Sequence, residues 1–262
     1  MKKISLIIFV TCILSMNAMA GSSGDTTLSK KQSGPVKDCF EGVNRGIFAF
    51  NQALDSALFK PLAKGYRQLP VPIKIGTSNV LDNLGNLITV PNNILQGQIL
   101  NAGVNSLRFV INTTIGILGF FDPAASSFGL DKKDKEDYGQ TLATWGMGPG
   151  CYIVLPVLGP STARDTVGSL VSFVGGDPWY NITVINDTHY VTDFDYYLSR
   201  ATSGIDFRAK NIDSLDNLEK NSMDFYASIK SLYVQDRQQK ILNSKKIIQG
   251  QDDSDWEEIE NN

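Results

Sequence analysis

Charged residues are scarce in the middle of this 262-residue sequence. Between Asn83 and Gly176 only 11 of 94 residues are charged, and seven of those 11 lie together in the segment DKKDKED at 131–137. A soluble stretch of that length ordinarily carries about 23 charges. Because most elements of a small domain show one face to water, the scarcity predicts that part of the surface faces something apolar. An unusually apolar soluble core is the alternative.

Long apolar runs are also missing once the N-terminus is set aside. The longest candidate for a membrane span, Gln98 to Phe121, is interrupted by Arg108 and by several asparagine, serine and threonine residues. A spanning helix needs about 20 predominantly apolar residues. The sequence therefore predicts helices that lie in the plane of a membrane and bury one side, rather than helices that cross it.

Histidine occurs once, at His189, and cysteine three times, so no cluster has the spacing of zinc ligands. A Ser/His/Asp triad would have to use His189, and no G-x-S-x-G elbow supplies its serine. The glycines of WGMGPG (145–150) match no phosphate-binding loop. The segment 131–137 lacks the D-x-D-x-D-G order of a calcium site, and we interpret it as a solvated loop. We therefore expect no catalytic residue, no metal and no cofactor.

The first 20 residues, MKKISLIIFVTCILSMNAMA, combine two lysines, an apolar stretch and an A-x-A pattern, which is typical of a secretory signal peptide. Cleavage would place the mature start near Gly21, and lipidation at Cys12 is the alternative. The mature chain then holds 22 basic and 27 acidic residues, a formal net charge of −5. That balance offers no general basic surface for nucleic acid.

Composition divides the rest of the chain. Residues 21–37 are polar and rich in glycine, serine and lysine, which predicts a flexible leader. Residues 250–262 hold six carboxylates and no base, which predicts a disordered acidic tail. The folded part is therefore expected at residues 38–249, as a single mainly α-helical domain.

Apolar residues recur at three- and four-residue spacing through this domain, which predicts amphipathic helices. We expect them around residues 41–59, 61–69, 72–84, 98–116, 163–174 and 191–215, with a last helix that ends near 240. Ser161 or Thr162 can cap the helix that starts at residue 163. The best strand candidate is CYIVLPVL at 151–158, and Pro156 restricts it to an edge strand or a hairpin arm.

Two isolated arginines, Arg108 and Arg164, are the only bases of the charge-poor region outside the segment 131–137. An arginine in apolar surroundings needs a carboxylate or a phosphate as its partner. The favoured option is a buried pair with Asp165, Asp122 or Glu41. The other option is contact with a lipid headgroup.

Four segments carry longer motifs. DCFEGVNRGIFAFN (38–51) is similar to D-P-x-E-x-x-N-R-x-x-F-x-F-N, and FVINTTIGILGFFDPAA (109–125) to F-x-x-N-[ST]-x-x-G-x-x-G-x-x-D-x-A. EDYGQTLATWGMGPGCYIVLPVLGPSTARD (136–165) is similar to [DE]-[FY]-G-Q-T-L-x-x-[WY]-G-x-G-x-G-P-Y-x-x-L-P-x-x-G-P-S-x-x-R-D, and MDFYASIKSLYVQDR (223–237) to a closing helix. Together, over residues 38–239, these segments resemble the MlaA/VacJ family of outer-membrane phospholipid-transport lipoproteins.

The resemblance implies a helical ring with a central channel, embedded in the inner leaflet of the outer membrane and with little or no β-structure. It implies a non-enzymatic protein that removes phospholipid from the outer leaflet and passes it to a periplasmic lipid carrier, in association with a porin trimer. The uncharged stretch 138–163 would then line or flank the channel. An envelope structural or surface-interaction protein and an envelope hydrolase are the alternatives, and the missing serine elbow counts against the hydrolase.

Under this resemblance, four residues are candidates for lining the channel or contacting lipid headgroups: Arg108, Trp145, Tyr152 and Arg164. The sequence also departs from the family pattern. No lipid-bearing cysteine follows the signal peptide, and Cys39 and Cys151 stand where the motifs have proline. A disulfide between them would explain both replacements if their Cα atoms lie within about 7 Å. Two unpaired buried cysteines are the alternative.

Overall fold

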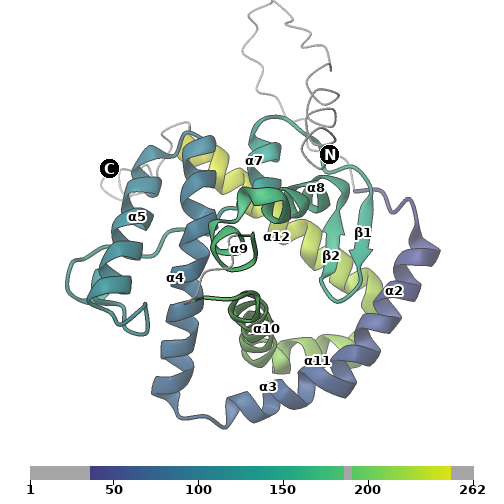
Figure 1. The fold of residues 1–262 in the computed structure, drawn as a ribbon. Coiled ribbons are helices and arrows are strands. Elements are labelled where there is room, and N and C mark those ends of the chain that lie inside the picture. Colours follow the sequence, from purple (N-terminus) through teal and green to yellow (C-terminus); the bar gives the residue numbers. More distant parts are fainter. Residues whose placement is uncertain (1–35, 186–190, 249–262) are drawn as a thin grey trace, which may run out of the picture. The chain divides into compact units, whose positions relative to one another are not determined.

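The structure is a computed structural model, and it describes residues 36–185 and 191–248 (Figure 1). The predicted signal peptide, the leader as far as residue 35, His189 and the acidic tail lie outside these residues. Helices dominate the described chain, and the only strands it contains form one short hairpin. The prediction of a mainly α-helical fold with little β-structure is therefore confirmed.

The elements follow one another in a simple order, with η marking a single turn of π-helix. They are α2 (Glu41–Leu54), η1 (Asp55–Phe59), α3 (Lys60–Arg67), α4 (Val71–Leu95), α5 (Ile99–Thr114), α6 (Pro123–Ser126), α7 (Tyr138–Thr144), β1 (Tyr152–Leu155), β2 (Gly159–Thr162), α8 (Ala163–Val171), η2 (Ser172–Gly176), α9 (Pro178–Tyr180), η3 (Asn181–Ile185), α10 (Asp193–Lys210), α11 (Ile212–Asn221) and α12 (Phe225–Ile248).

The hairpin and the helix after it form as their local sequence predicts. β1 pairs with β2 in antiparallel fashion, Tyr152 opposite Thr162, and Pro156 falls in the connecting turn, where no ladder hydrogen bond is needed. Thr162 then caps α8, because its side-chain oxygen accepts a hydrogen bond from the backbone N–H of Asp165 at 3.2 Å. The hairpin arm and the cap are therefore confirmed.

Helix α4 is longer than its sequence predicts, because it continues through Pro91 to Leu95. This last part is rich in asparagine, a poor helix former. Tertiary hydrogen bonds stabilise it: Asn93 donates to Gln98 at 2.9 Å and accepts from Asn105 of α5 at 2.9 Å. Propensity alone could not have revealed these partners.

The helices of residues 36–185 and 191–248 run around a ring (Figure 1). α2, η1 and α3 form one curved arc, and α4 stands on the opposite side. α4 contacts α7, α7 contacts α12, and α12 contacts β2 of the hairpin, whose other strand returns to α2. α10 packs against both α3 and α4. The segments that close the ring are therefore far apart in sequence.

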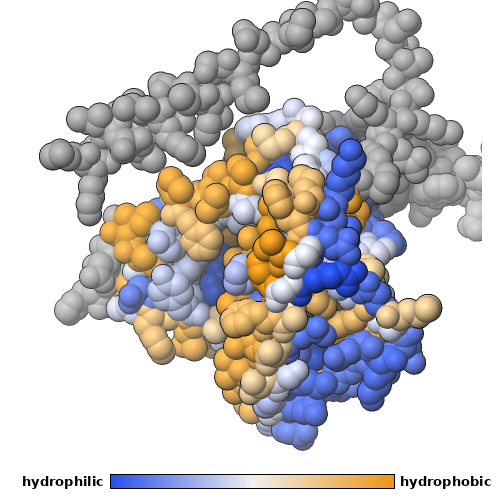
Figure 2. Space-filling view, turned by 90° about the vertical axis from the view of Figure 1, so that its right-hand side faces the viewer, coloured by the Kyte–Doolittle hydropathy of each residue, from blue (hydrophilic) through white to orange (hydrophobic). Residues whose placement is uncertain are grey.

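Polarity in this ring is inverted relative to a water-soluble domain. Among the described residues, 22 polar or charged residues are buried, against 10 apolar ones, and 38 large apolar residues are exposed. α2 shows the inversion: Val43 and Phe50 are 62% and 55% exposed, whereas Asn44 is 2% exposed. Figure 2, which views the side where α2 lies, shows a hydrophobic band beside a hydrophilic face. No helix in the described ranges has both the length and the hydropathy needed to cross a bilayer.

Candidate functional site

A cavity of about 550 Å³ lies among α4, the hairpin, α8, α10 and α12, and we call it the central cavity. Its apolar wall consists of Ile88, Leu155, Leu158, Pro160 and Phe173. Its polar wall includes four tyrosines and four charged residues, which are Tyr138, Tyr196, Tyr197, Tyr233, Asp137, Asp165, Arg200 and Arg237. Five residues of the uncharged stretch 138–163 belong to this lining. A wall of this mixed kind suits an amphipathic molecule.

A second cavity of about 350 Å³ adjoins the central one. Ile88, Asp137 and Arg200 line both cavities, and we call these three residues the junction. They come from α4, from the residue before α7 and from α10. The far wall of the second cavity includes Leu81, Leu84, Lys135, Trp179 and Lys240.

Arg237 of α12 ties two carboxylates of the central cavity together. It pairs with both oxygens of Asp137, at 2.6 and 2.9 Å, and with both oxygens of Asp165, at 3.1 and 2.9 Å. Asp137 caps α7 by accepting from the N–H of Gln140, and Asp165 lies in the first turn of α8. The Tyr233 hydroxyl donates to Asp165 at 2.6 Å. This cluster therefore fixes the starts of α7 and α8 against α12.

The same cluster keeps its carboxylates ionised. Burial raises the pKa of Asp137 and of Asp165, but the hydrogen bonds and charge of Arg237 outweigh it and hold each pKa below the ordinary value. Burial beside Asp165 raises the pKa of Tyr233 far above its ordinary value. With fixed protonation states at neutral pH, these groups are suited to hold a wall in place rather than to transfer protons.

Arg200 is held differently. Its Nη2 atom lies 2.5 Å from an oxygen of Asp177, which is fully buried and accepts at its other oxygen from the N–H of Trp179. The Arg200 guanidinium lies over the Tyr196 ring, 5.2 Å from its centroid. Its side chain nevertheless remains 48% exposed. Sequence reasoning missed this residue, although Tyr196 and Arg200 lie one helical turn apart and so share a face.

The structure buries the two arginines that the sequence had singled out. Arg108 pairs with Asp122 at 2.8 Å and Arg164 with Asp165 at 2.9 Å, and each arginine side chain is 5% exposed. The favoured option, a buried ion pair, is what the structure holds for both. Carboxylates thus occupy both guanidiniums, and contact of either arginine with a lipid headgroup stays a prediction.

Tyr152 and Trp145 lie in contrasting places. Tyr152 is fully buried and packs with Tyr226 and Tyr233, so it is a core residue and not a channel-lining one. Trp145 is 62% exposed, and its indole N–H donates to the carbonyl of Leu95 at 3.1 Å. A lipid contact at Trp145 stays a prediction.

The interpretation of 131–137 as a solvated loop is wrong at its end. Glu136 is 4% exposed and accepts hydrogen bonds from Gln96 and Ser244, both at 2.9 Å. Burial raises the pKa of Glu136. Asp137 belongs to the Arg237 cluster described above. A run of charges carries no sign of which members have tertiary partners, so the sequence could not separate these two from the lysines before them.

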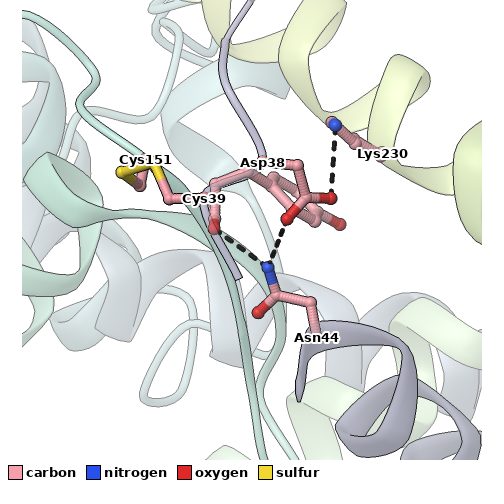
Figure 3. The surroundings of a disulfide bond; sticks show 6 residues. Asp38, Cys39, Asn44, Cys151 and Lys230 are labelled. Carbon is pink, nitrogen blue, oxygen red and sulfur yellow. Dashed lines mark hydrogen bonds and ion pairs between the residues drawn. A yellow bond between two sulfur atoms is a disulfide. The ribbon is translucent and has the colours of Figure 1, made fainter. Parts of the chain in front are cut away.

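Cys39 and Cys151 are joined by a disulfide in the structure, with their Cα atoms 5.6 Å apart (Figure 3). That distance lies within the range disulfides require. Beside the bond, the Asn44 amide donates to Asp38 at 2.7 Å and to the carbonyl of Tyr152 at 3.0 Å. The N–H of Val154 donates back to Asn44 at 2.9 Å. A buried asparagine of α2 thus takes the place of a neighbouring strand beside β1.

Comparisons with known proteins agree with this architecture. Residues 36–240 match the family model described as MlaA lipoprotein. An uncharacterized protein of Rickettsia bellii is 37% identical over 212 residues, covering 80% of this chain and 79% of that one. The intermembrane phospholipid transport system lipoprotein MlaA of Haemophilus influenzae is 29% identical and covers 91% and 92%, and that of Escherichia coli is 30% identical and covers 85% and 84%.

A solved structure reported as the structural basis for maintenance of bacterial outer membrane lipid asymmetry aligns with a TM-score of 0.64 and 31% identity, over 77% of this chain and 97% of that one. The region that matches the family model, residues 36–240, contains the hairpin and the lining residues of both cavities. The chain belongs to the MlaA lipoprotein family.

Proposed function

We propose that this protein is a non-enzymatic component of intermembrane phospholipid transport. It sits in the inner leaflet of the outer membrane, takes phospholipid that has reached the outer leaflet, and passes it through the ring to a periplasmic lipid carrier. The names of the Haemophilus influenzae and Escherichia coli relatives and the subject of the matching structure support the transport role. Residues 1–20 would direct export as a signal peptide and would be removed in the course of it.

The inverted polarity of the ring is the observation that carries this proposal. Exposing 38 large apolar side chains to water would be costly, at about 25 cal/mol for each Å² of apolar surface. Lipid removes that cost, and it explains the scarcity of charge in the central region. A ring without a spanning helix can meet lipid by lying within one leaflet.

Two apolar tips are suited to reach into the lipid. Ile117 and Leu118 follow α5, and Val157 lies in the hairpin turn, and all three are more than half exposed. All three also have positive φ, at 53°, 56° and 66°, which is costly for residues other than glycine. Solubility in water gives no reason to display apolar side chains on strained turns, whereas insertion into a leaflet does.

The water-facing side is marked by charge. Arg45 on α2 pairs with Glu41 at 2.8 Å and with Asp224 at 2.6 Å, on an exposed surface. The same helix carries Val43 and Phe50 exposed. A helix with one charged and one apolar exposed side is expected to lie at the boundary between water and lipid.

The central cavity is the proposed route of the lipid. Its apolar residues can contact acyl chains, and its hydroxyls and charges can contact a headgroup. Passage of this kind needs no nucleotide or metal at the protein itself. A porin trimer that holds the ring in the outer membrane and a periplasmic carrier that accepts the lipid are the partners we propose.

The test measures phospholipid in the outer leaflet of a Gram-negative host that lacks its own relative and carries this protein or a variant. Ser169 lines the central cavity, so Ser169→Trp should block the route and raise outer-leaflet phospholipid. Ser56 is exposed on η1, and Ser56→Trp is the matched control. Full activity of Ser169→Trp would reject the cavity as the route. Failure of the unmodified protein to lower outer-leaflet phospholipid would instead favour an envelope structural protein.

A further inference from the structure

The two cavities share the lining residues of the junction, so a molecule that passed between them there would come close to protein charge. Arg200 is the only cationic residue, in the described parts of the chain, that lines both cavities. Ile88 and Asp137 complete the junction. A headgroup that moves from one cavity to the other therefore comes within reach of the Arg200 side chain.

The other cations near the two cavities have carboxylate partners, as Arg200 does, but they differ from it in position. Arg237 is 12% exposed and bound to Asp137 and Asp165. On the far wall, Lys135 pairs with Asp82, and Lys240 pairs with Asp236 at 2.8 Å. Of the two cavities, these lysines line the second one and not the central one. They can attract an anion at one side, but they do not stand between the cavities.

Arg200 combines a fixed position with open donors. A guanidinium has five N–H groups, and the bond to Asp177 engages Nη2. Because Asp177 is fully buried and bound to the N–H of Trp179, it anchors one edge of the guanidinium. The Tyr196 ring supports its face. The side chain is 48% exposed and lines both cavities.

The acidic residues nearby are not free to repel an incoming anion strongly. Asp137 is paired with Arg237 through two hydrogen bonds, and Asp177 with Arg200 itself. Glu136, in the lining of the second cavity, is buried and hydrogen-bonded to Gln96 and Ser244. Arginine partners thus offset the charges of Asp137 and Asp177, whereas Glu136 has only neutral donors and is buried away from solvent.

The linings on either side of the junction fit the rest of a phospholipid. Leu155, Leu158 and Phe173 lie on the side of the central cavity, and Leu81 and Leu84 on the side of the second one. Arginine matches the geometry of a phosphate oxygen pair better than lysine does, because its planar donors can bind two oxygens at once.

We propose that Arg200 binds the phosphate of the phospholipid headgroup as it passes the junction, and so makes the route selective for lipids that carry a phosphate. This assignment rests on the proposed transport function and names the residue that recognises the cargo. It predicts that the protein distinguishes a phospholipid from a diacylglycerol with the same acyl chains.

The experiment titrates the detergent-solubilised mature protein with dioleoyl phosphatidylglycerol or with dioleoylglycerol and counts bound lipid by native mass spectrometry. The unmodified protein should bind phosphatidylglycerol more tightly. Arg200→Gln should weaken binding of phosphatidylglycerol about tenfold, the loss expected for one hydrogen bond to a charged group, and should leave dioleoylglycerol unchanged. Arg200→Lys should lose less, because it keeps the charge.

Arg67→Gln is the matched control, because Arg67 is similarly exposed, at 43%, is also paired with one aspartate, Asp213, and lines neither cavity. It should bind both lipids as the unmodified protein does. Equal weakening of both lipids by Arg200→Gln would show a structural role and overturn the assignment, as would unchanged binding of phosphatidylglycerol. If the unmodified protein binds no phospholipid at all, the proposed function fails first, and the assignment falls with it.

Discussion

Removing Arg237 should be the most damaging single change to the wall of the central cavity. Arg237→Met keeps an unbranched apolar stem but removes the guanidinium, and it leaves Asp165, whose side chain is 8% exposed, with Arg164 and Tyr233 as its remaining partners. Removing one partner of a buried ion pair costs about 3–5 kcal/mol. Most of the cost arises at Asp165, because Asp137 is 46% exposed and water can solvate it.

That cost corresponds to a fall in Tm of about 6–20 °C, at roughly 2–4 °C per kcal/mol for a chain of this size. Thermal unfolding in detergent micelles, followed by circular dichroism at pH 7, measures it. Arg67→Met is the control, because an exposed pair such as Arg67 with Asp213 contributes about 0–1 kcal/mol.

Acidification gives a second, independent readout. The folded state holds the pKa of both Asp137 and Asp165 below the value of 3.8 expected without the fold. Their ionisation therefore stabilises the unmodified protein above about pH 4, and this contribution is lost as the pH falls through the lowered pKa values. Without Arg237 these carboxyls should protonate more readily, so the penalty of Arg237→Met should be smaller at pH 4 than at pH 7. A Tm within about 2 °C of the unmodified protein at pH 7, or a penalty equal at both pH values, would refute the reasoning.

Three further outcomes are expected. Non-reducing peptide mapping of protein from the envelope should find Cys39 linked to Cys151, and free thiols at both positions would reject the bond. For a sequence separation of 112, the chain-entropy model sets an upper limit of about 4–5 kcal/mol on the stabilisation that this disulfide contributes. Gly168→Ala should destabilise the protein by about 1–3 kcal/mol, because its new Cβ would lie 2.4 Å from the backbone nitrogen of Gly139. In the same melt, Gly103→Ala inside α5 meets nothing within 4 Å and should stabilise the protein slightly, because alanine favours a helix over glycine. The mature protein should leave outer membranes with detergent and not with high salt, because salt screens charges and does not weaken apolar burial; release by salt alone would contradict an embedded ring.

The sequence predicted the helical fold and its exposed apolar surface because both depend on short-range patterns. The apolar spacing around 41–59 specifies a helix whatever its apolar side meets, and the scarcity of charge between Asn83 and Gly176 does not depend on how the helices pack. The cap at Thr162 and the hairpin arm before it are equally local. Each of these predictions concerns residues within a few positions of one another.

The site was harder to predict, because its partners are distant in sequence. Arg237 meets Asp137 and Asp165 across 100 and 72 positions. The isolated position of Arg108 in a charge-poor region made it a candidate for lipid contact, yet its guanidinium is buried in an ion pair with Asp122. Arg200 stood in an ordinarily charged helix, and only the fold shows that it reaches both cavities.

The position of these polar contacts follows from the inversion of the fold. A ring that presents its apolar side chains outward keeps few of them for a core, and the described core cluster is small, built around Tyr152, Val154 and Tyr226. The ring must therefore be closed by directional bonds: Asn44 to β1, the disulfide beside it, and Arg237 between α7, α8 and α12. In the proposed membrane location, lipid would not compete for these hydrogen bonds as water does, so they would be better protected. The residues that make these bonds also give the interior the polarity that a phospholipid headgroup needs. The contacts that close the ring therefore also suit it to the proposed cargo.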